Sequence, residues 1–137
     1  MKKDNVTDYF EVSHTADLAL RVIGKDIFDL LRSAEKGMYV LMGLIDDIRH
    51  VTELNFTLAY LDDESLLVNY LNELLYYVST GVAPRLIDIV VEQKHVKFST
   101  KAAVVLQRTH EIKAATFHDI SLNTIKNGLE AVIVFDV

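Results

Sequence analysis

Residues 127–137 read NGLEAVIVFDV, and this stretch carries the clearest local structural signal in the chain. The pair Asn127-Gly128 is typical of a two-residue hairpin turn. The residues after it alternate with a period of two, which predicts a β-strand and makes this stretch the second half of an antiparallel hairpin. The two faces of that strand carry Ala131, Ile133, Phe135 and Val137 on one side, and Val132, Val134 and Asp136 on the other.

Strand signals also dominate the chain before this hairpin. The same alternation predicts strands in the second half of the chain at residues 86–91, 95–99, 102–107 and 111–118, with 120–125 as a further candidate. Three earlier stretches, 9–14, 18–23 and 51–60, have the same period.

Two helices are predicted before residue 80. Apolar residues recur at helical spacing from Ile27 to about Met42, after Asp26 as a predicted N-cap and before Gly43 as a stop. A second apolar stripe begins at Leu66, after an acidic capping segment, and fades toward Ser79.

The order of these elements predicts the fold class. Helices that occur early, followed by a run of hairpins, favour an α+β fold with a mainly antiparallel sheet and two helices packed on one face, in two layers. The chain shows no linker, repeat or low-complexity tract, so we expect residues 1–137 to form a single domain.

Composition narrows the classes of function. There are no cysteines, which excludes disulfides, thiolate metal sites and a cysteine nucleophile. The net charge of −6, with 14 basic and 20 acidic residues, argues against strong direct binding of nucleic acid and favours a cation or a basic protein partner. No secretory signal and no apolar run long enough to span a membrane is present, so we expect a cytoplasmic protein.

Two polar positions at opposite ends of the sequence are candidates for a functional site. Residues 13–17 (SHTAD) form a polar turn between two predicted strands, and Asp136 lies on a strand face with two valines. One interpretation is that Asp136 is simply solvated at a strand end. The other is that Asp17, Asp136 and the carboxylate or carbonyl of Val137 hold a hard cation, calcium or magnesium, since both prefer oxygen ligands.

Four segments in register resemble the archease family. Residues 13–17 (SHTAD), followed by a strand and Gly24, resemble its His-Thr-Ala-Asp opening, and residues 71–76 (LNELLY) resemble its second-helix segment. Residues 111–118 (EIKAATFH) are similar to its Glu-Val-Lys-Ala-x-Thr-Tyr-His strand, and residues 134–137 (VFDV) resemble its ending on an aspartate and an aliphatic residue. Together these segments span nearly the whole chain.

The resemblance implies an accessory protein and not an enzyme. Archeases assist the RtcB-type RNA ligase of tRNA splicing by promoting its guanylylation and multiple turnover. They bind a divalent metal, typically calcium, through ligands that correspond here to Asp17, Asp136 and Val137. Two departures concern the surroundings: Ser13 replaces a frequent acid, and residues 93–109 lack the glycines and acids often found there.

Other candidate residues have modest expected roles. His14 and His118 are expected to be hydrogen-bonding anchors, with His118 on the strand face of Ile112 and Ala114, and Lys113 a solvated strand residue. Glu73 is expected at the rim of the second helix, with Tyr76 and Tyr77 at the edge of the core. The alternative function is a metal-dependent phosphoester hydrolase that activates water between Asp17 and Asp136.

Overall fold

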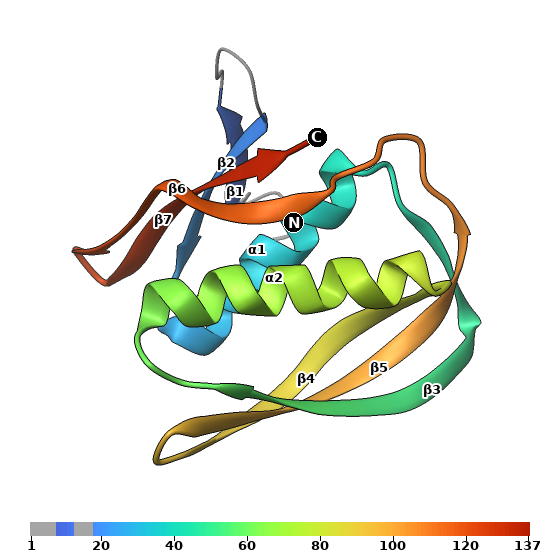
Figure 1. Ribbon diagram of the computed structural model, residues 1–137, viewed down its shortest axis with the longest axis horizontal. Helices are drawn as coiled ribbons and strands as arrows, with labels where there is room; N and C mark the ends of the chain where they lie inside the picture. Colours follow the sequence, from blue (N-terminus) through green and yellow to red (C-terminus); the bar gives the residue numbers. More distant parts are fainter. Residues whose placement is uncertain (1–7, 13–17) are drawn as a thin grey trace.

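The computed structural model describes residues 8–12 and 18–137. Over these residues the chain forms two helices and seven strands (Figure 1). In order these are β1 (Tyr9–Val12), β2 (Leu18–Gly24), α1 (Ile27–Leu41), β3 (Ile45–Ala59), α2 (Asp63–Ser79), β4 (Val82–Glu92), β5 (His95–Gln107), β6 (Ala114–Ile125) and β7 (Gly128–Asp136).

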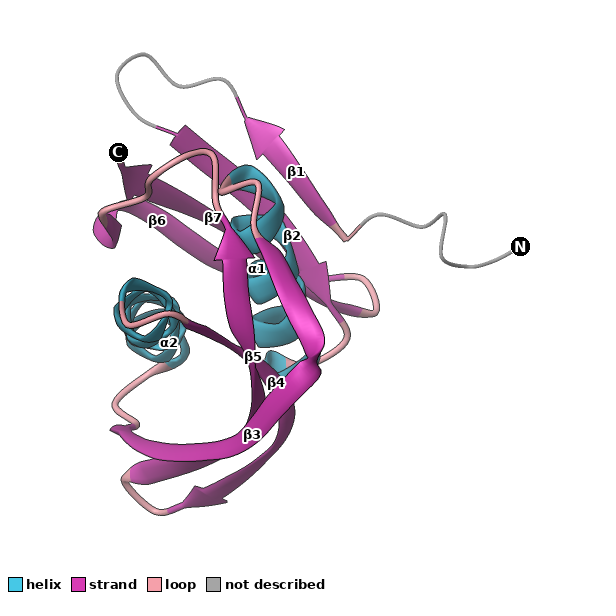
Figure 2. Ribbon diagram, turned by 90° about the vertical axis from the view of Figure 1, so that its right-hand side faces the viewer, coloured by secondary structure: helices cyan, strands magenta, loops and turns pink. Residues whose placement is uncertain are grey.

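The strands are divided between two antiparallel sheets. One has the order β1-β2-β7-β6 and the other the order β3-β5-β4. Figure 2, which views α2 nearly end-on, shows this helix between the two sheets. The predicted α+β class is confirmed. In detail, the helices cover one face of each of two sheets, because β3, β4 and β5 pair only with one another.

Four strands are longer than their sequence patterns predict, among them β4, which covers Val82–Glu92 and not only residues 86–91. β3 begins at Ile45 and not near residue 51, because residues 45–47 pair with β5 before a register shift interrupts the ladder. The two strands predicted at 95–99 and 102–107 are one continuous strand, β5, which pairs with β3 and β4 along most of its length. Two segments predicted separately at 111–118 and 120–125 also merge, into β6.

Both predicted helix starts are confirmed. Asp26 accepts a hydrogen bond from the backbone N–H of Asp29, and Asp62 accepts one from Ser65. These carboxylates satisfy amide groups that have no partner within the helix. At the other end of α1, Gly43 follows the C-cap with a φ of 61°, a conformation that glycine adopts without strain.

The core lies between the two sheets and around the helices. Its largest fully buried side chains include Tyr70 of α2 and Phe98 of β5, whose rings stack with centroids 5.0 Å apart. Phe56 of β3 stacks on Phe98 at the same distance. In β7, Ala131, Ile133 and Phe135 share one face and are fully buried. This packing fixes β7 between its neighbours.

The predicted hairpin joins β6 to β7. Ile125 pairs with Gly128, so the turn residues are Lys126 and Asn127, and Asn127 has a φ of 67°. A Cβ on Gly128 would lie 2.3 Å from the carbonyl oxygen of Gly24. Glycine at this position therefore allows the hairpin to approach the end of β2.

No helix within the described part of the chain is long and apolar enough to cross a membrane.

Candidate functional site at the paired ends of β2 and β7

The start of β2 lies beside the end of β7. Leu18, the first residue of β2, pairs with Phe135, and Ala19 pairs with Val134. In the sequence, Leu18 directly follows Asp17, and Phe135 directly precedes Asp136. Asp17 itself lies outside the described residues. The ladder therefore pairs Leu18 with Phe135, the immediate sequence neighbours of the two aspartates. Asp17 and Asp136 are more than a hundred residues apart in the chain.

Asp136 closes β7 with its side chain in solvent. Its Cα lies opposite that of Ala114, and its carbonyl oxygen accepts a hydrogen bond of 2.8 Å from the backbone N–H of Lys113. The residue is exposed, whereas Val134 on the same face is 2% exposed. The carboxylate therefore keeps its hydration, and burial does not force it to take a partner.

The donors at this strand end fit a hard cation. No described residue hydrogen-bonds to the Asp136 carboxylate or forms an ion pair with it, so both oxygens are available. Val137 follows at 50% exposure and adds main-chain oxygen. Carboxylate and carbonyl oxygens are the ligands that calcium and magnesium prefer. Within residues 8–12 and 18–137, no three acidic or histidine side chains form a group that could hold a metal.

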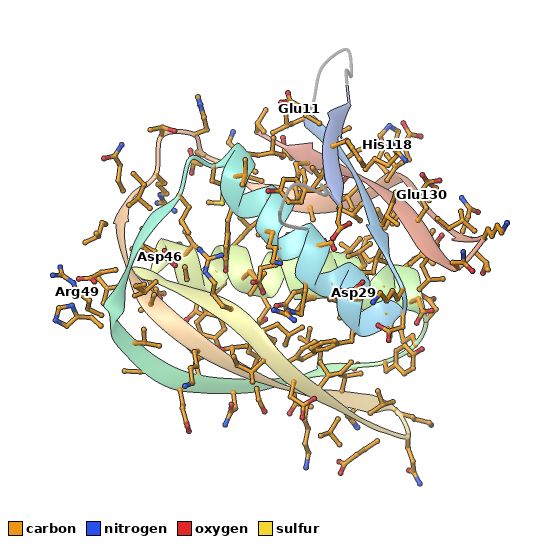
Figure 3. The ribbon with its side chains drawn as sticks, turned by 180° about the vertical axis from the view of Figure 1, so that it is seen from behind. Glu11, Asp29, Asp46, Arg49, His118 and Glu130 are labelled. Atoms are coloured by element: carbon orange, nitrogen blue, oxygen red, sulfur yellow. The ribbon has the colours of Figure 1, made fainter. Side chains whose placement is uncertain are left out.

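An irregular segment of β6 follows the residues that pair with the end of β7. Thr116 pairs with Val134 and Ser121 pairs with Val132, so residues 117–120 oppose Ile133 alone. The predicted face shared by His118, Ile112 and Ala114 is wrong, because this bulge removes His118 from the ladder and leaves its side chain 72% exposed. His118 Nε2 lies 3.1 Å from the Asp119 carboxylate. Figure 3 shows His118 on the same sheet as Glu11 and Glu130.

Four of the remaining predicted residues, Glu73, Tyr76, Tyr77 and Lys113, lie on or near α2. Lys113 is exposed and Glu73 is half-buried, in line with their expected surface and rim positions. Tyr77 packs on Phe56 with ring centroids 5.7 Å apart, as expected for the core edge. The same expectation is wrong for Tyr76, which is 60% exposed because the stripe of α2 turns away from it. His14 lies outside the described residues.

A buried carboxylate, Glu35 of α1, is absent from the sequence predictions. It is 3% exposed and accepts hydrogen bonds from Tyr70 Oη at 2.6 Å and from the backbone N–H of Leu86 at 3.0 Å. Burial raises the pKa of Glu35 above its ordinary value, and the Tyr70 and Leu86 hydrogen bonds oppose that shift. The sequence does contain a signal for this inward position, because Glu35 is four residues from Leu31 and four from Tyr39, both of which lie on the apolar side of α1.

The fold defines a class of small α+β proteins built from a helix pair between two antiparallel sheets. Residues 9–137 match the Archease protein family (MTH1598/TM1083). Because the match covers nearly the whole chain, the protein belongs to the archease family.

Individual relatives agree with this assignment. The chain is 27% identical to the protein archease of Methanosarcina mazei, covering 94% of this chain and 95% of that one. It is 28% identical to the protein archease of Saccharolobus islandicus, with 95% and 97% covered.

Two solved structures share the fold. One is described as an archease and possible chaperone from Thermotoga maritima, with a TM-score of 0.71, 24% identity and coverage of 92% of this chain and 94% of that one. The other is protein 1598 of Methanobacterium thermoautotrophicum, with a TM-score of 0.74, 20% identity and coverage of 96% and 100%.

Proposed function

We propose that this archease is a cytoplasmic accessory protein of an RtcB-type RNA ligase, promoting guanylylation and multiple turnover of the ligase without being an enzyme itself. In this proposal, a divalent cation, calcium in the first instance, binds at the strand end through Asp17, Asp136 and Val137. Membership of the archease family supports the accessory role.

The pairing of Leu18 with Phe135 carries the proposal of a metal site. Consecutive Cα atoms are about 3.8 Å apart, so each aspartate is attached one residue beyond a paired position. The Asp136 carboxylate is exposed and has no partner among the described residues, so it is a suitable ligand. A bound cation would also offset repulsion between two carboxylates in a chain whose net charge is already −6.

A guanylylation assay tests the accessory role directly. An RtcB-type ligase is incubated with radiolabelled GTP and manganese, with and without an equimolar amount of this chain, and covalently labelled ligase is followed over time. We expect labelled ligase to appear faster in the presence of the chain, and the ligase to complete several rounds of joining. An unchanged time course would contradict the proposal.

The same preparation distinguishes the alternative of a phosphoester hydrolase. The isolated chain should not turn over phosphoester substrates when calcium, magnesium or manganese is supplied. Hydrolysis by the isolated chain that is abolished in Asp136→Asn would favour the hydrolase and count against an accessory protein. If the chain does not hydrolyse phosphoesters alone but stimulates the ligase, the hydrolase alternative is excluded.

A further inference from the structure

A cleft of about 400 Å³ lies between the carboxyl-terminal half of α2 and the connection from β5 to β6. Its volume lies within the range of about 300–1,000 Å³ that small ligands or a few side chains occupy. The polar and aromatic side chains that line it are Asn72, Tyr76, Ser79, Arg108, Glu111 and Lys113.

The walls of the cleft are fixed to one another. The Asn72 side-chain amide makes two hydrogen bonds with the backbone of Ala115, donating to its carbonyl at 3.0 Å and accepting from its N–H at 2.8 Å. Ile112, buried at 5% exposure, anchors the connection to the core. A cleft whose walls are already positioned costs less entropy to fill than one that must be ordered on binding.

The cleft is lined by two cations, Arg108 and Lys113, and by one acid, Glu111. Among the described residues, neither Arg108 nor Lys113 forms an ion pair, and Glu111 is equally without one. The cleft therefore has one excess positive charge in a protein with a net charge of −6. A second cavity near the β6–β7 hairpin has a balanced lining, with Lys25 and Lys126 set against Asp8 and Asp29. Excess positive charge distinguishes the α2 cleft.

An exposed aromatic ring lies beside these cations. Tyr76 is 60% exposed, and its ring packs edge-on against Tyr77, with centroids 5.2 Å apart. The Tyr76 carbonyl accepts a hydrogen bond from Ser79 Oγ at 2.5 Å, so this carbonyl has a partner at the helix end. Tyrosine and arginine are enriched at the centres of protein interfaces.

The cleft also adjoins the proposed metal site. Lys113 lines the cleft, and its backbone N–H donates to the carbonyl of Asp136. A partner that contacts the end of β7 therefore lies next to the cleft, because Lys113 belongs to both places.

We propose that this cleft docks an acidic segment of the ligase partner, whose carboxylates pair with Arg108 and Lys113 and whose adjacent apolar side chain packs on Tyr76. The inference rests on the proposed function, because it specifies the chemistry of the partner's contact. The affinity of the ligase for the cleft falls as ionic strength rises, because raising the salt from about 0.1 M to about 1 M shortens the Debye length from about 10 Å to about 3 Å.

The test measures the affinity of an RtcB-type ligase for the full chain by titration calorimetry at low and high salt. Arg108→Glu and Tyr76→Ser should each raise Kd about tenfold, a change of roughly 1.4 kcal/mol, and Arg108→Glu should weaken the salt dependence. Lys101→Glu is the matched charge control on the three-stranded sheet. Leu106→Ser is the matched apolar control, because Leu106 is also 60% exposed. Both controls should bind like the unmodified chain.

Three results separate the inference from the proposed function. Weakened binding by the cleft variants alone supports the inference. If the ligase binds every variant as tightly as the unmodified chain, the cleft is not the contact and the accessory role stands. If the ligase does not bind the unmodified chain at all, both proposals fail. Should Arg108→Glu not fold by circular dichroism, Arg108→Gln replaces it, with a smaller expected rise in Kd.

Discussion

Tyr70 Oη donates a hydrogen bond of 2.6 Å to Glu35 Oε1, and both residues are buried between the two sheets. The same oxygen accepts from the backbone N–H of Leu86. One carboxylate therefore joins α1, α2 and β4. This junction holds the three-stranded sheet against the helices whose other sides position β2, β6 and β7.

The first prediction concerns the Tyr70 hydroxyl. Tyr70→Phe removes one donor from a buried carboxylate and should lower the free energy of unfolding by about 1.5–3 kcal/mol, the range for hydrogen bonds to charged groups. Urea denaturation measures the loss. Tyr76→Phe is the control, since that ring is exposed, and it should leave the urea midpoint unchanged. Equal midpoints for Tyr70→Phe and the unmodified chain would show that the Glu35 junction adds no stability.

The second prediction concerns pH. Because burial raises the pKa of Glu35 above 4.5, the folded state holds this proton more tightly than the unfolded state. Its contribution to stability is therefore fully present below pH 4.5 and is lost as the pH rises through the raised pKa. As the pH is lowered, the free energy of unfolding of the unmodified chain should increase relative to that of Glu35→Gln. Parallel stability curves for the two proteins over this range would contradict the raised pKa.

The third prediction concerns the link between α2 and β6. Asn72→Ala removes both side-chain hydrogen bonds to the edge of β6 at Ala115. We expect a loss of about 1–3 kcal/mol in the free energy of unfolding and faster hydrogen exchange of the Ala115 amide. Amide exchange by NMR checks both the site and the size of the effect. Unchanged protection at Ala115 would show that β7 alone holds this strand.

The sequence predicts local structure better than long-range pairing. Asp26 and Asp62 identify both helix starts because an N-cap is a contact within four residues. The hairpin between β6 and β7 is equally local, although its turn residues are Lys126 and Asn127 and Gly128 already belongs to β7. By contrast, the division into two sheets depends on which strands pair across long separations, and no pattern in β3 specifies β5 as its only neighbour.

The candidate site shows the same division between local and distant information. The alternation in β7 assigns Ile133 and Phe135 to one face but does not determine what lies beside Asp136, and Val134 on the other face is buried as well. The bulge at residues 117–120 has no glycine or proline to mark it, so the exposure of His118 could not be predicted. The α2 cleft forms between residues 72–79 and 108–113, which only the assembled fold brings together.

The fourth prediction concerns Val137 as a ligand. In a protein prepared to end at Val137, residues appended after it replace a free carboxylate with a peptide carbonyl, a weaker ligand for a hard cation, and should weaken calcium binding. A tag of the same length before Met1 should leave the affinity unchanged. Calorimetric titration of calcium into both proteins makes the comparison. Equal affinities would assign the site to the aspartates without the carboxylate of Val137.

A calcium titration of the unmodified chain and of Asp17→Asn, Asp136→Asn and Asp88→Asn tests whether Asp17 and Asp136 share a cation. We expect one calcium ion to bind the unmodified chain and to raise its Tm by roughly 10 °C at about a hundred times its Kd. Asp17→Asn and Asp136→Asn should each lose this response, and Asp88→Asn, altered at an exposed acid of β4, should retain it. Retention of full calcium affinity by both Asp17→Asn and Asp136→Asn would contradict a shared cation at the ends of β2 and β7.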